Sequence, residues 1–228
     1  PIVQSFLPPD VADKVPAQAR TWTRILGATQ IIGGVAYATG IARRPGAALL
    51  SLARQAILSH WSPSLQLDSS AIEPALAQAP LACFVTLHHG TELRGCIGCL
   101  EPQGALVDNL IHFARAAAFD DPRFPPLSRH ELPQCSLSLS LLGPLSPLPA
   151  SQRSELEAAL QPGEDGLWLT SPGHRATFLP AVWRELPDRH AFVSQLLRKG
   201  GWPHGQWPTN LQAWRYRALE IVDDLPLA

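Results

Sequence analysis

The segment LACFVTLHHGTELRGCIGCLE, residues 81–101, decides the fold class of this chain. Two strand-like runs flank the turn sequence His89–Gly90–Thr91, and this pattern predicts a β-hairpin. A second hairpin is predicted around Pro172–Gly173, and CSLSLSLL, residues 135–142, alternates apolar and polar residues with a period of two. Strands that follow one another through hairpins favour antiparallel sheet over repeated strand–helix–strand units.

Helical periodicity accounts for much of the remaining chain. Four segments place apolar residues at helical spacing: residues 47–61, 103–121, 151–163 and 188–201. The third of these is predicted to be a short helix with its N-terminal cap near Ser151. The segment QAWRYRALEIV, residues 212–222, alternates throughout and is predicted to be one final strand. Together these elements predict an α+β fold.

Composition and charge limit the classes of partner. The chain has 228 residues, of which 46% are hydrophobic and 16% charged, with a net charge of −1. This balance argues against nucleic acid or an acidic membrane surface as a partner. No stretch of about 20 apolar residues or signal peptide is present, so we expect a cytoplasmic protein. Residues 1–45 are proline-broken and read as an N-terminal extension or linker, or as the tail of an upstream fused domain.

The sequence Cys96–Ile97–Gly98–Cys99 raises the question of metal or redox chemistry. A structural zinc site needs four ligands, but Cys83 and Cys135 form no second close pair and lie in runs typical of buried thiols. Residues three apart on a strand also point to opposite faces. A redox pair needs its first cysteine at a helix N-terminus, which this strand does not offer. We therefore expect no metal, and the absence of cofactor motifs predicts no cofactor.

A third interpretation makes Cys96 a nucleophile. Strand alternation places Arg94, Cys96 and Gly98 on one face, so a guanidinium is expected beside the thiol, where it favours the thiolate form. Gly98 on that face is expected to leave room for a group to approach the backbone. The alternative is that Cys96 is a small packed residue and that Arg94 pairs with a surface carboxylate. Residue types alone leave both interpretations open.

Other polar residues are less decisive. Asp121 and Arg123 lie in the proline-rich loop DPRFPPL, which either presents an acid or base with an anion clamp or contains an internal Asp–Arg pair. His88 and His89 are interpreted as exposed residues of the hairpin turn. Arg198 with neighbouring tryptophans combines phosphate-contacting and base-stacking residue types, but tryptophans at this density are more typical of a core.

Four motifs together resemble one known family. LRGCIG (residues 93–98), AAAFDDPRFPPL (116–127), GLWLTSPGHRATFLPAVW (166–183) and FVSQLLRKGGWP (192–203) are similar, in this order, to the AmmeMemoRadiSam system protein A family, which carries the AMMECR domain. The resemblance runs from about residue 47 to residue 222. It implies two subdomains, each with an antiparallel β-sheet and flanking helices, and a cleft between them. The larger subdomain would come from both ends of residues 46–228 and the smaller would be inserted.

The resemblance also implies a site and a pathway, although it names no reaction. The cleft would be lined by LRGCIG, with Cys96 as the candidate catalytic residue. The expected substrate-binding residues are Arg94, Gly95, Gly98, Asp121 and Arg123. Arginines without an acidic cluster in the same motifs predict an anionic or carbonyl-bearing ligand.

Members of this family occur with Memo-like and radical SAM proteins, which are therefore the expected partners. An enzyme or enzyme subunit, a non-enzymatic binding module and a nucleic-acid-associated regulatory protein all remain open.

Overall fold

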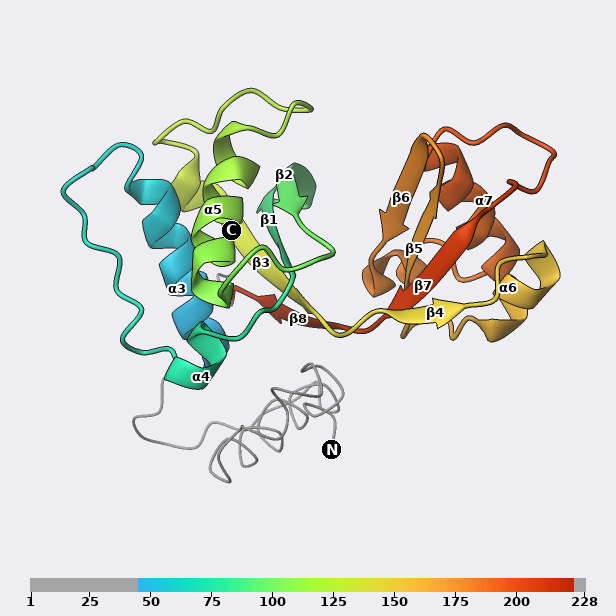
Figure 1. Cartoon of the computed structure of the whole chain (residues 1–228). Helices are drawn as coiled ribbons and strands as arrows, with labels where there is room; N and C mark the ends of the chain where they lie inside the picture. The colour runs from blue at the N-terminus through green and yellow to red at the C-terminus, as the bar shows by residue number, and fades with distance from the viewer. Residues whose placement is uncertain (1–44, 224–228) are drawn as a thin grey trace, which may run out of the picture. The chain divides into compact units, whose positions relative to one another are not determined.

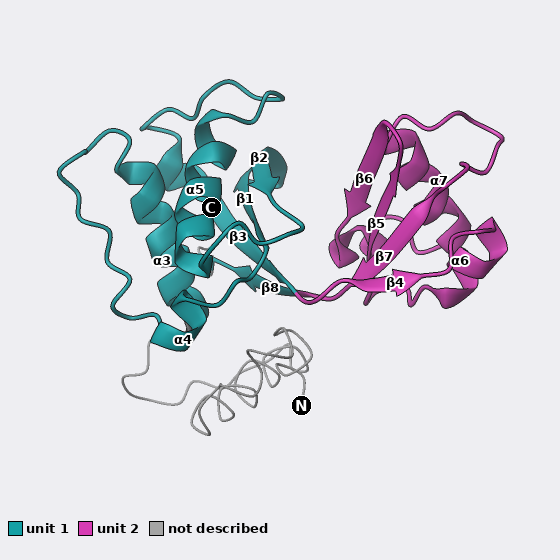
Figure 2. Ribbon diagram, viewed as in Figure 1, with its two compact units in different colours: residues 1–142, 219–228 teal, residues 143–218 magenta. Residues whose placement is uncertain are grey.

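The computed structural model describes residues 45–223, so the predicted extension lies, apart from Pro45, outside the described residues. The described chain forms two compact units (Figure 2). Unit 1 contains the residues up to Leu142 together with those from Leu219 onward, and unit 2 contains Gly143–Ala218. Each unit has one four-stranded sheet and its own helices, as the α+β prediction requires. The predicted cleft between subdomains stays a prediction.

Unit 1 places two long helices against one face of its sheet (Figure 1). Its strands lie in the order β2-β1-β3-β8. The helices are α3 (Pro45–Leu58), α4 (Pro74–Ala77), α5 (Leu106–Phe119) and the 3₁₀ helix η2 (Leu132–Gln134). The strands are β1 (Cys83–His89), β2 (Glu92–Gly98), β3 (Cys135–Leu142) and β8 (Ala218–Val222).

The core of unit 1 follows the periodicity of the sequence. In α5, the helical stripe Leu106, Leu110, Phe113 and Ala117 is buried, as its spacing predicts. The strand β1 and the first half of β3 bury alternate residues on the helix side and leave the intervening residues half-buried on the opposite face, while the second half of β3 is buried throughout. We call that opposite face the polar face of sheet 1; its central members are Thr86, His88, Ser136 and Ser138.

Unit 2 repeats the principle on a smaller scale. Its strands lie in the order β4-β7-β5-β6. They are β4 (Ser146–Leu148), β5 (Gly166–Ser171), β6 (His174–Phe178) and β7 (Gln212–Tyr216), and the helices are α6 (Arg153–Ala159), η3 (Pro180–Arg184) and α7 (Arg189–Lys199). In the core, Trp183 stacks on Phe192 with ring centroids 3.7 Å apart. Both rings are buried among leucines from α6, α7 and β5.

One local prediction was wrong, and a second was right about the helix but not about its cap. The segment predicted as one final strand is two: β7 belongs to the sheet of unit 2 and β8 to that of unit 1, with Arg217 between them. Alternation continues through the break because both halves are strands, so polarity does not reveal the change of sheet. Helix α6 begins at Arg153 after Gln152, which makes no side-chain cap, and the hydroxyl of Ser151 instead donates to the Glu155 carboxylate.

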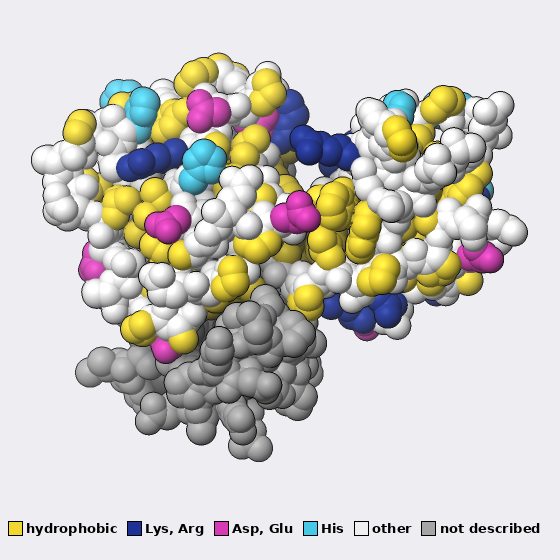
Figure 3. Space-filling view, viewed as in Figure 1, with side chains coloured by type: hydrophobic (Ala, Val, Ile, Leu, Met, Phe, Trp, Pro, Cys, Tyr) yellow, Lys and Arg dark blue, Asp and Glu magenta, His cyan; other side chains and the backbone are white. Residues whose placement is uncertain are grey.

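The surface and helices of the described residues add two facts. Between residues 45 and 223, no helix combines the length and apolar character that crossing a membrane requires. On the face of unit 1 drawn in Figure 3, positive and negative side chains are interspersed, in keeping with a net charge of −1.

Candidate functional site

The polar face of sheet 1 brings the motif cysteine into a row of small polar side chains. Cys96 on β2 is the register partner of Thr86 on β1, and Thr86 is in turn the partner of Ser138 on β3. His88 and Ser136 form the next row along the same strands. Partners on one face of a sheet lie about 4.5–5.5 Å apart, so these side chains form one contiguous surface.

The Cys96 sulfur is held by its strand neighbour. The Thr86 hydroxyl donates to the Cys96 sulfur at 3.3 Å, and the cysteine is half-buried. Cys96 and Thr86 form a non-hydrogen-bonded pair of the antiparallel ladder, so the backbone N–H and carbonyl of Cys96 point away from β1, toward the open edge of the sheet. In a pair of this kind the two side chains come especially close. The pairing therefore explains why threonine and cysteine touch.

Asp121 and Arg123 occupy those outward backbone groups. The Cys96 N–H donates to Asp121 Oδ2 at 2.9 Å, and Arg123 Nη2 donates to the Cys96 carbonyl at 3.2 Å. The Arg123 guanidinium also grips the Asp121 carboxylate, with Nε to Oδ1 at 2.9 Å and Nη2 to Oδ2 at 2.6 Å. The two side chains thus replace a further strand at the edge and block pairing with another chain. We call them the edge clasp.

The clasp determines the charge of Asp121. The hydrogen bond from Arg123 lowers the pKa of Asp121 to about 2, against the opposing effect of burial. A carboxylate this acidic, with both oxygens occupied, is a poor general base near pH 7. Of the two interpretations that the sequence left open for this loop, the structure shows the internal Asp–Arg pair. Half of the Arg123 side chain stays exposed, at 52%.

The predicted contact between Arg94 and the Cys96 thiol is not the one that the structure contains. A bulge between Leu87 and His88 leaves Arg94 as an extra residue on β2, so simple alternation fails there. Arg94 Nε donates to Glu131 Oε1 at 3.1 Å. The Glu131 carboxylate also accepts the Ser128 N–H, and these bonds lower its pKa to about 2. The cation that contacts Cys96 is Arg123.

The two glycines of LRGCIG are explained by close packing. A Cβ on Gly95 would lie 2.0 Å from the carbonyl oxygen of Ala117, so glycine lets β2 approach α5. A Cβ on Gly98 would lie 2.2 Å from the carbonyl oxygen of Cys83. A group does approach Gly98, as expected of that residue, but the group is the neighbouring strand.

Two of the other cysteines are packed thiols, and Cys99 is half-buried like Cys96. Cys83 and Cys135 are buried and free, as predicted, and burial raises the pKa of Cys83 to about 12. Burial also raises the pKa of Cys99, whose backbone N–H donates to the Cys83 carbonyl. Within residues 45–223, no group of three or more His, Cys, Asp or Glu side chains is placed to hold a metal ion. The expectation of a metal-free protein stays a prediction.

Sequence reasoning overlooked Thr86 and wrongly placed His88 as an exposed residue of the turn. His89 is exposed, as expected of the turn, but His88 is half-buried within β1 and shares the polar face with Thr86. The alternation of β1 contained this signal, since residues 84, 86 and 88 must share a face once 83, 85 and 87 are assigned to the core. The register that aligns Thr86 with Cys96 was not readable, because the bulge shifts it.

A two-unit α+β protein with a cysteine-bearing edge hairpin is the class that this fold and site define. The chain matches the AMMECR1 family over residues 50–221 and belongs to that family, which confirms the resemblance of its motifs. A protein of Methanothermobacter thermautotrophicus is 35% identical over 164 residues, covering 72% of this chain and 85% of the relative. A protein of Aeropyrum pernix is 34% identical over 183 residues, covering 76% of each.

A solved structure shares the fold. The crystal structure of an uncharacterized protein from Pyrococcus horikoshii superposes with a TM-score of 0.73 at 28% identity, covering 82% of this chain and 95% of that one. These comparisons establish the family and the fold.

Proposed function

We propose that the polar face of sheet 1 is a thiol-dependent reaction site for an anionic or carbonyl-bearing substrate, with Cys96 as the nucleophile. The observation that carries this proposal is the half-buried Cys96 sulfur, oriented by the Thr86 hydroxyl at 3.3 Å within a row of polar side chains. A packed structural cysteine has no need of such a surface, whereas a nucleophile needs access and a fixed direction. Cys83 and Cys135 illustrate the packed alternative in the same sheet.

Each neighbour has a role in this proposal. His88, one row further along the face, is the base that takes the thiol proton, directly or through one water. Arg123, anchored by the buried Asp121, presents its exposed donors beside Cys96 to the substrate's negative charge. Arg94, Gly95 and Gly98 act indirectly by holding β2 in place.

The proposed reaction is acyl transfer to sulfur. The Cys96 sulfur attacks the carbonyl carbon while its proton passes to His88, and the bond from that carbon to the leaving group breaks. This step forms a thioester and releases the leaving group. Water then attacks the thioester, which frees the acid and restores the thiol. All four cysteines are free, and the reaction needs Cys96 reduced, so the proposal places the protein in the cytoplasm.

A model ester tests this proposal without knowledge of the substrate. The full chain is mixed with p-nitrophenyl acetate, and release of p-nitrophenolate is followed for a burst of one equivalent, with the acetylated residue located by mass spectrometry. We expect acetyl on Cys96 and no burst in Cys96→Ser, while Cys99→Ser keeps the burst. His88→Gln should slow it by about a hundredfold, the scale of general-base catalysis, and the neighbouring His89→Gln should not.

Two outcomes would contradict the proposal. Acetylation of Cys96 and Cys99 at equal rates would mean that the reaction depends only on how accessible each thiol is, and not on activation of Cys96. A burst of equal rate in His88→Gln and wild type would show that His88 is not the general base, and the row of polar side chains would then have no catalytic role. Folding of each variant is checked by circular dichroism, so that loss of the burst is not confused with loss of structure.

A second function is favoured by the charges of the site. The pKa of Asp121 is lowered mainly by Arg123, and that of Glu131 by the Ser128 N–H and then by Arg94, so neither provides a carboxylic acid near pH 7. A non-enzymatic module that binds a substrate or a protein partner needs no such acid. In this alternative Memo-like and radical SAM proteins are the proposed partners. A pull-down that retains such a partner in wild type and in Cys96→Ser, together with no burst, would favour the module.

A further inference from the structure

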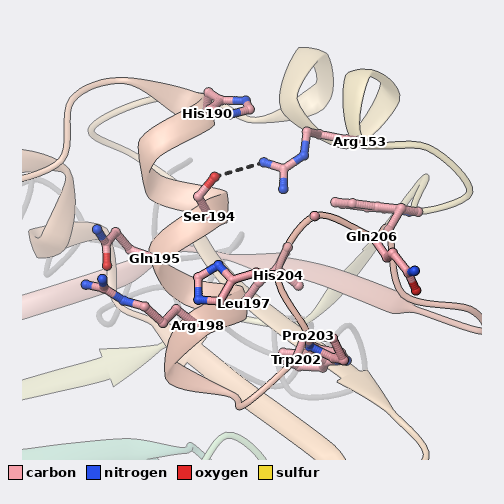
Figure 4. A pocket seen from close by; sticks show the side chains of 12 residues that line it. Arg153, His190, Ser194, Gln195, Leu197, Arg198, Trp202, Pro203, His204 and Gln206 are labelled. Atoms are coloured by element: carbon pink, nitrogen blue, oxygen red, sulfur yellow. Dashed lines mark hydrogen bonds between the residues drawn. The ribbon is translucent and has the colours of Figure 1, made fainter.

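Unit 2 contains a pocket that the Cys96 site does not use (Figure 4). Its volume is about 420 Å³, within the range of small-molecule sites. Helix α7 lines one side, and the segment from Trp202 to Trp207 lines another. Arg153 at the start of α6 completes the wall. Every lining residue belongs to unit 2, so the pocket is a property of that unit alone.

The pocket is lined by basic side chains, and the one carboxylate bonded to them among the described residues, Glu157 at Arg153 and His190, is not a lining residue. Four of its residues carry positive or protonatable side chains: Arg153, His190, Arg198 and His204. None of its lining residues is aspartate or glutamate. A chain with a net charge of −1 has no general excess of positive charge, so this local gathering is specific to the pocket.

Helix α7 explains how the polar side chains of the pocket come together. His190, Ser194 and Arg198 are spaced four residues apart and so share one helical face, while Phe192, Val193 and Leu196 are buried in the core on another. The hydrophobic face fixes the rotation of the helix. It therefore fixes the direction of the polar face as well.

The two arginines of the pocket, Arg153 and Arg198, differ in the hydrogen bonds that their side chains make. Arg153 Nη1 donates to Ser194 Oγ at 3.0 Å and to Glu157 Oε1 at 3.2 Å, while its Nε and Nη2 make no hydrogen bond within the described part of the chain. The side chain of Arg198 has no hydrogen bond or ion pair to any residue between 45 and 223. Arg153 is thus a positioned donor with unused N–H groups, and Arg198 is an uncompensated charge at the same pocket.

The apolar part of the pocket is aromatic. The Arg153 guanidinium lies over the Trp207 ring, 5.4 Å from its centroid. The indole N–H of Trp207 donates to the Ala150 carbonyl, and that of Trp202 to Ser171 Oγ. Both rings are therefore fixed in orientation, which suits them to contact a flat ligand group.

We propose that this pocket binds a small organic anion that joins a planar ring to a phosphate or carboxylate group. The anion is held by Arg198 and by the free donors of Arg153, and the ring packs against Trp207 and Trp202. The proposal goes beyond the Cys96 chemistry and is independent of it. It gives a role to Arg198 and Trp202 of the motif FVSQLLRKGGWP, which take no part in the site on the polar face of sheet 1.

Nuclear magnetic resonance of the ¹⁵N-labelled full chain tests the proposal with phenyl phosphate as the probe. We expect the indole N–H signals of Trp202 and Trp207 to shift, and those of Trp168 and Trp214, which stack on each other outside the pocket lining, to stay. Phenol and inorganic phosphate each carry one half of the probe and should bind at least about tenfold more weakly. Sodium benzoate in place of phenyl phosphate tells whether carboxylate serves as well as phosphate.

Matched arginine variants assign the anion. Arg198→Ala should weaken phenyl phosphate binding about tenfold, the loss of one charge-assisted contact. Arg175→Ala removes an exposed arginine of unit 2 outside the pocket and should change the affinity by less than about twofold. Cys96→Ser should leave binding unchanged, which separates this site from the reaction proposed above.

The pocket proposal is overturned if phenyl phosphate moves neither the Trp202 nor the Trp207 signal at about 10 mM, well above the millimolar range of weak binding. Equal affinity for phenol and phenyl phosphate would remove the anion site. Equal losses in Arg198→Ala and Arg175→Ala would show diffuse attraction to a positive surface instead of a pocket.

Discussion

The arginines of the LRGCIG region and Arg198 of the unit 2 pocket are used in opposite ways, whereas Arg153 of that pocket pairs with Glu157. Arg94 and Arg123 each hold a carboxylate, at 3.1 Å and 2.6 Å, and both carboxylates are thereby kept ionised. Arg198 has no such partner within the described residues. Removing a guanidinium that is paired with an acid leaves that acid without its partner and so lowers stability, whereas removing an unpaired one leaves no acid without a partner. The comparison predicts that stability losses concentrate in unit 1.

Gly95→Ala should have the largest effect on stability, because it disrupts the packing of β2 against α5. The added Cβ would meet the carbonyl oxygen of Ala117 at 2.0 Å, so β2 must move away from α5. We expect a loss of about 3 kcal/mol in the free energy of unfolding, at the upper end of overpacking effects. Urea denaturation followed by circular dichroism measures it. A loss below about 1 kcal/mol would mean that the edge strand moves freely and that the clasp positions nothing.

Asp121→Asn should come next and should change how stability depends on pH. The pKa of Asp121 is about 2 in the folded chain and 3.8 without its partners. The lowered pKa contributes about 2 kcal/mol above pH 4, and this contribution is lost as the pH falls from 4 toward 2. The variant should therefore be less stable by about 2 kcal/mol at pH 6 and closer to wild type at pH 2.5.

The neighbouring Asp120 supplies the control for this test. Asp120 is exposed, and Asp120→Asn should leave both the stability and its pH dependence near those of wild type. An equal loss in the two variants would assign the effect to the helix end rather than to the clasp. A loss in Asp121→Asn that is the same at pH 6 and pH 2.5 would show that the carboxylate charge is not its cause.

Arg94→Gln should have a smaller effect, since its partner is partly exposed. The Glu131 side chain is 37% exposed, so solvent screens the pair, and we expect a loss of about 1 kcal/mol or less. Alkylation of Cys96 by iodoacetamide should keep its rate within about twofold, because Arg94 is bonded to Glu131 and not to the thiol. A large drop in that rate would restore the direct role for Arg94 that alternation alone suggested.

These cases show where sequence reasoning reached the fold and where it stopped. The hairpin, the buried stripe of α5 and the alternating β3 were readable because each is encoded by the spacing of near neighbours. The Asp121–Arg123 pair was foreseen as one of two alternatives, since its members are two residues apart. Glu131 was not, because it lies 37 residues from Arg94 and no local pattern joins them.

Single-residue shifts of the backbone were equally invisible. The bulge at Arg94 and the change of sheet at Arg217 leave the polarity pattern of the sequence unchanged. The bulge alters which residues are paired, and the change of sheet alters which strands are neighbours. The pocket of unit 2 combines residues from three separate segments. The sequence identified Arg198 and the tryptophans as binding types, yet only the folded chain places Arg153 beside them.

Arg198→Ala should have the smallest effect on stability, and this makes it the sharpest test of the comparison. Arg198 is exposed and has no ion pair among the described residues, so its removal should change the free energy of unfolding by less than about 0.5 kcal/mol. The same substitution should weaken phenyl phosphate binding about tenfold. Urea denaturation and the tryptophan titration on one sample separate the two effects. A loss above about 1 kcal/mol would make Arg198 a structural residue like Arg123 and would end the contrast between the two regions.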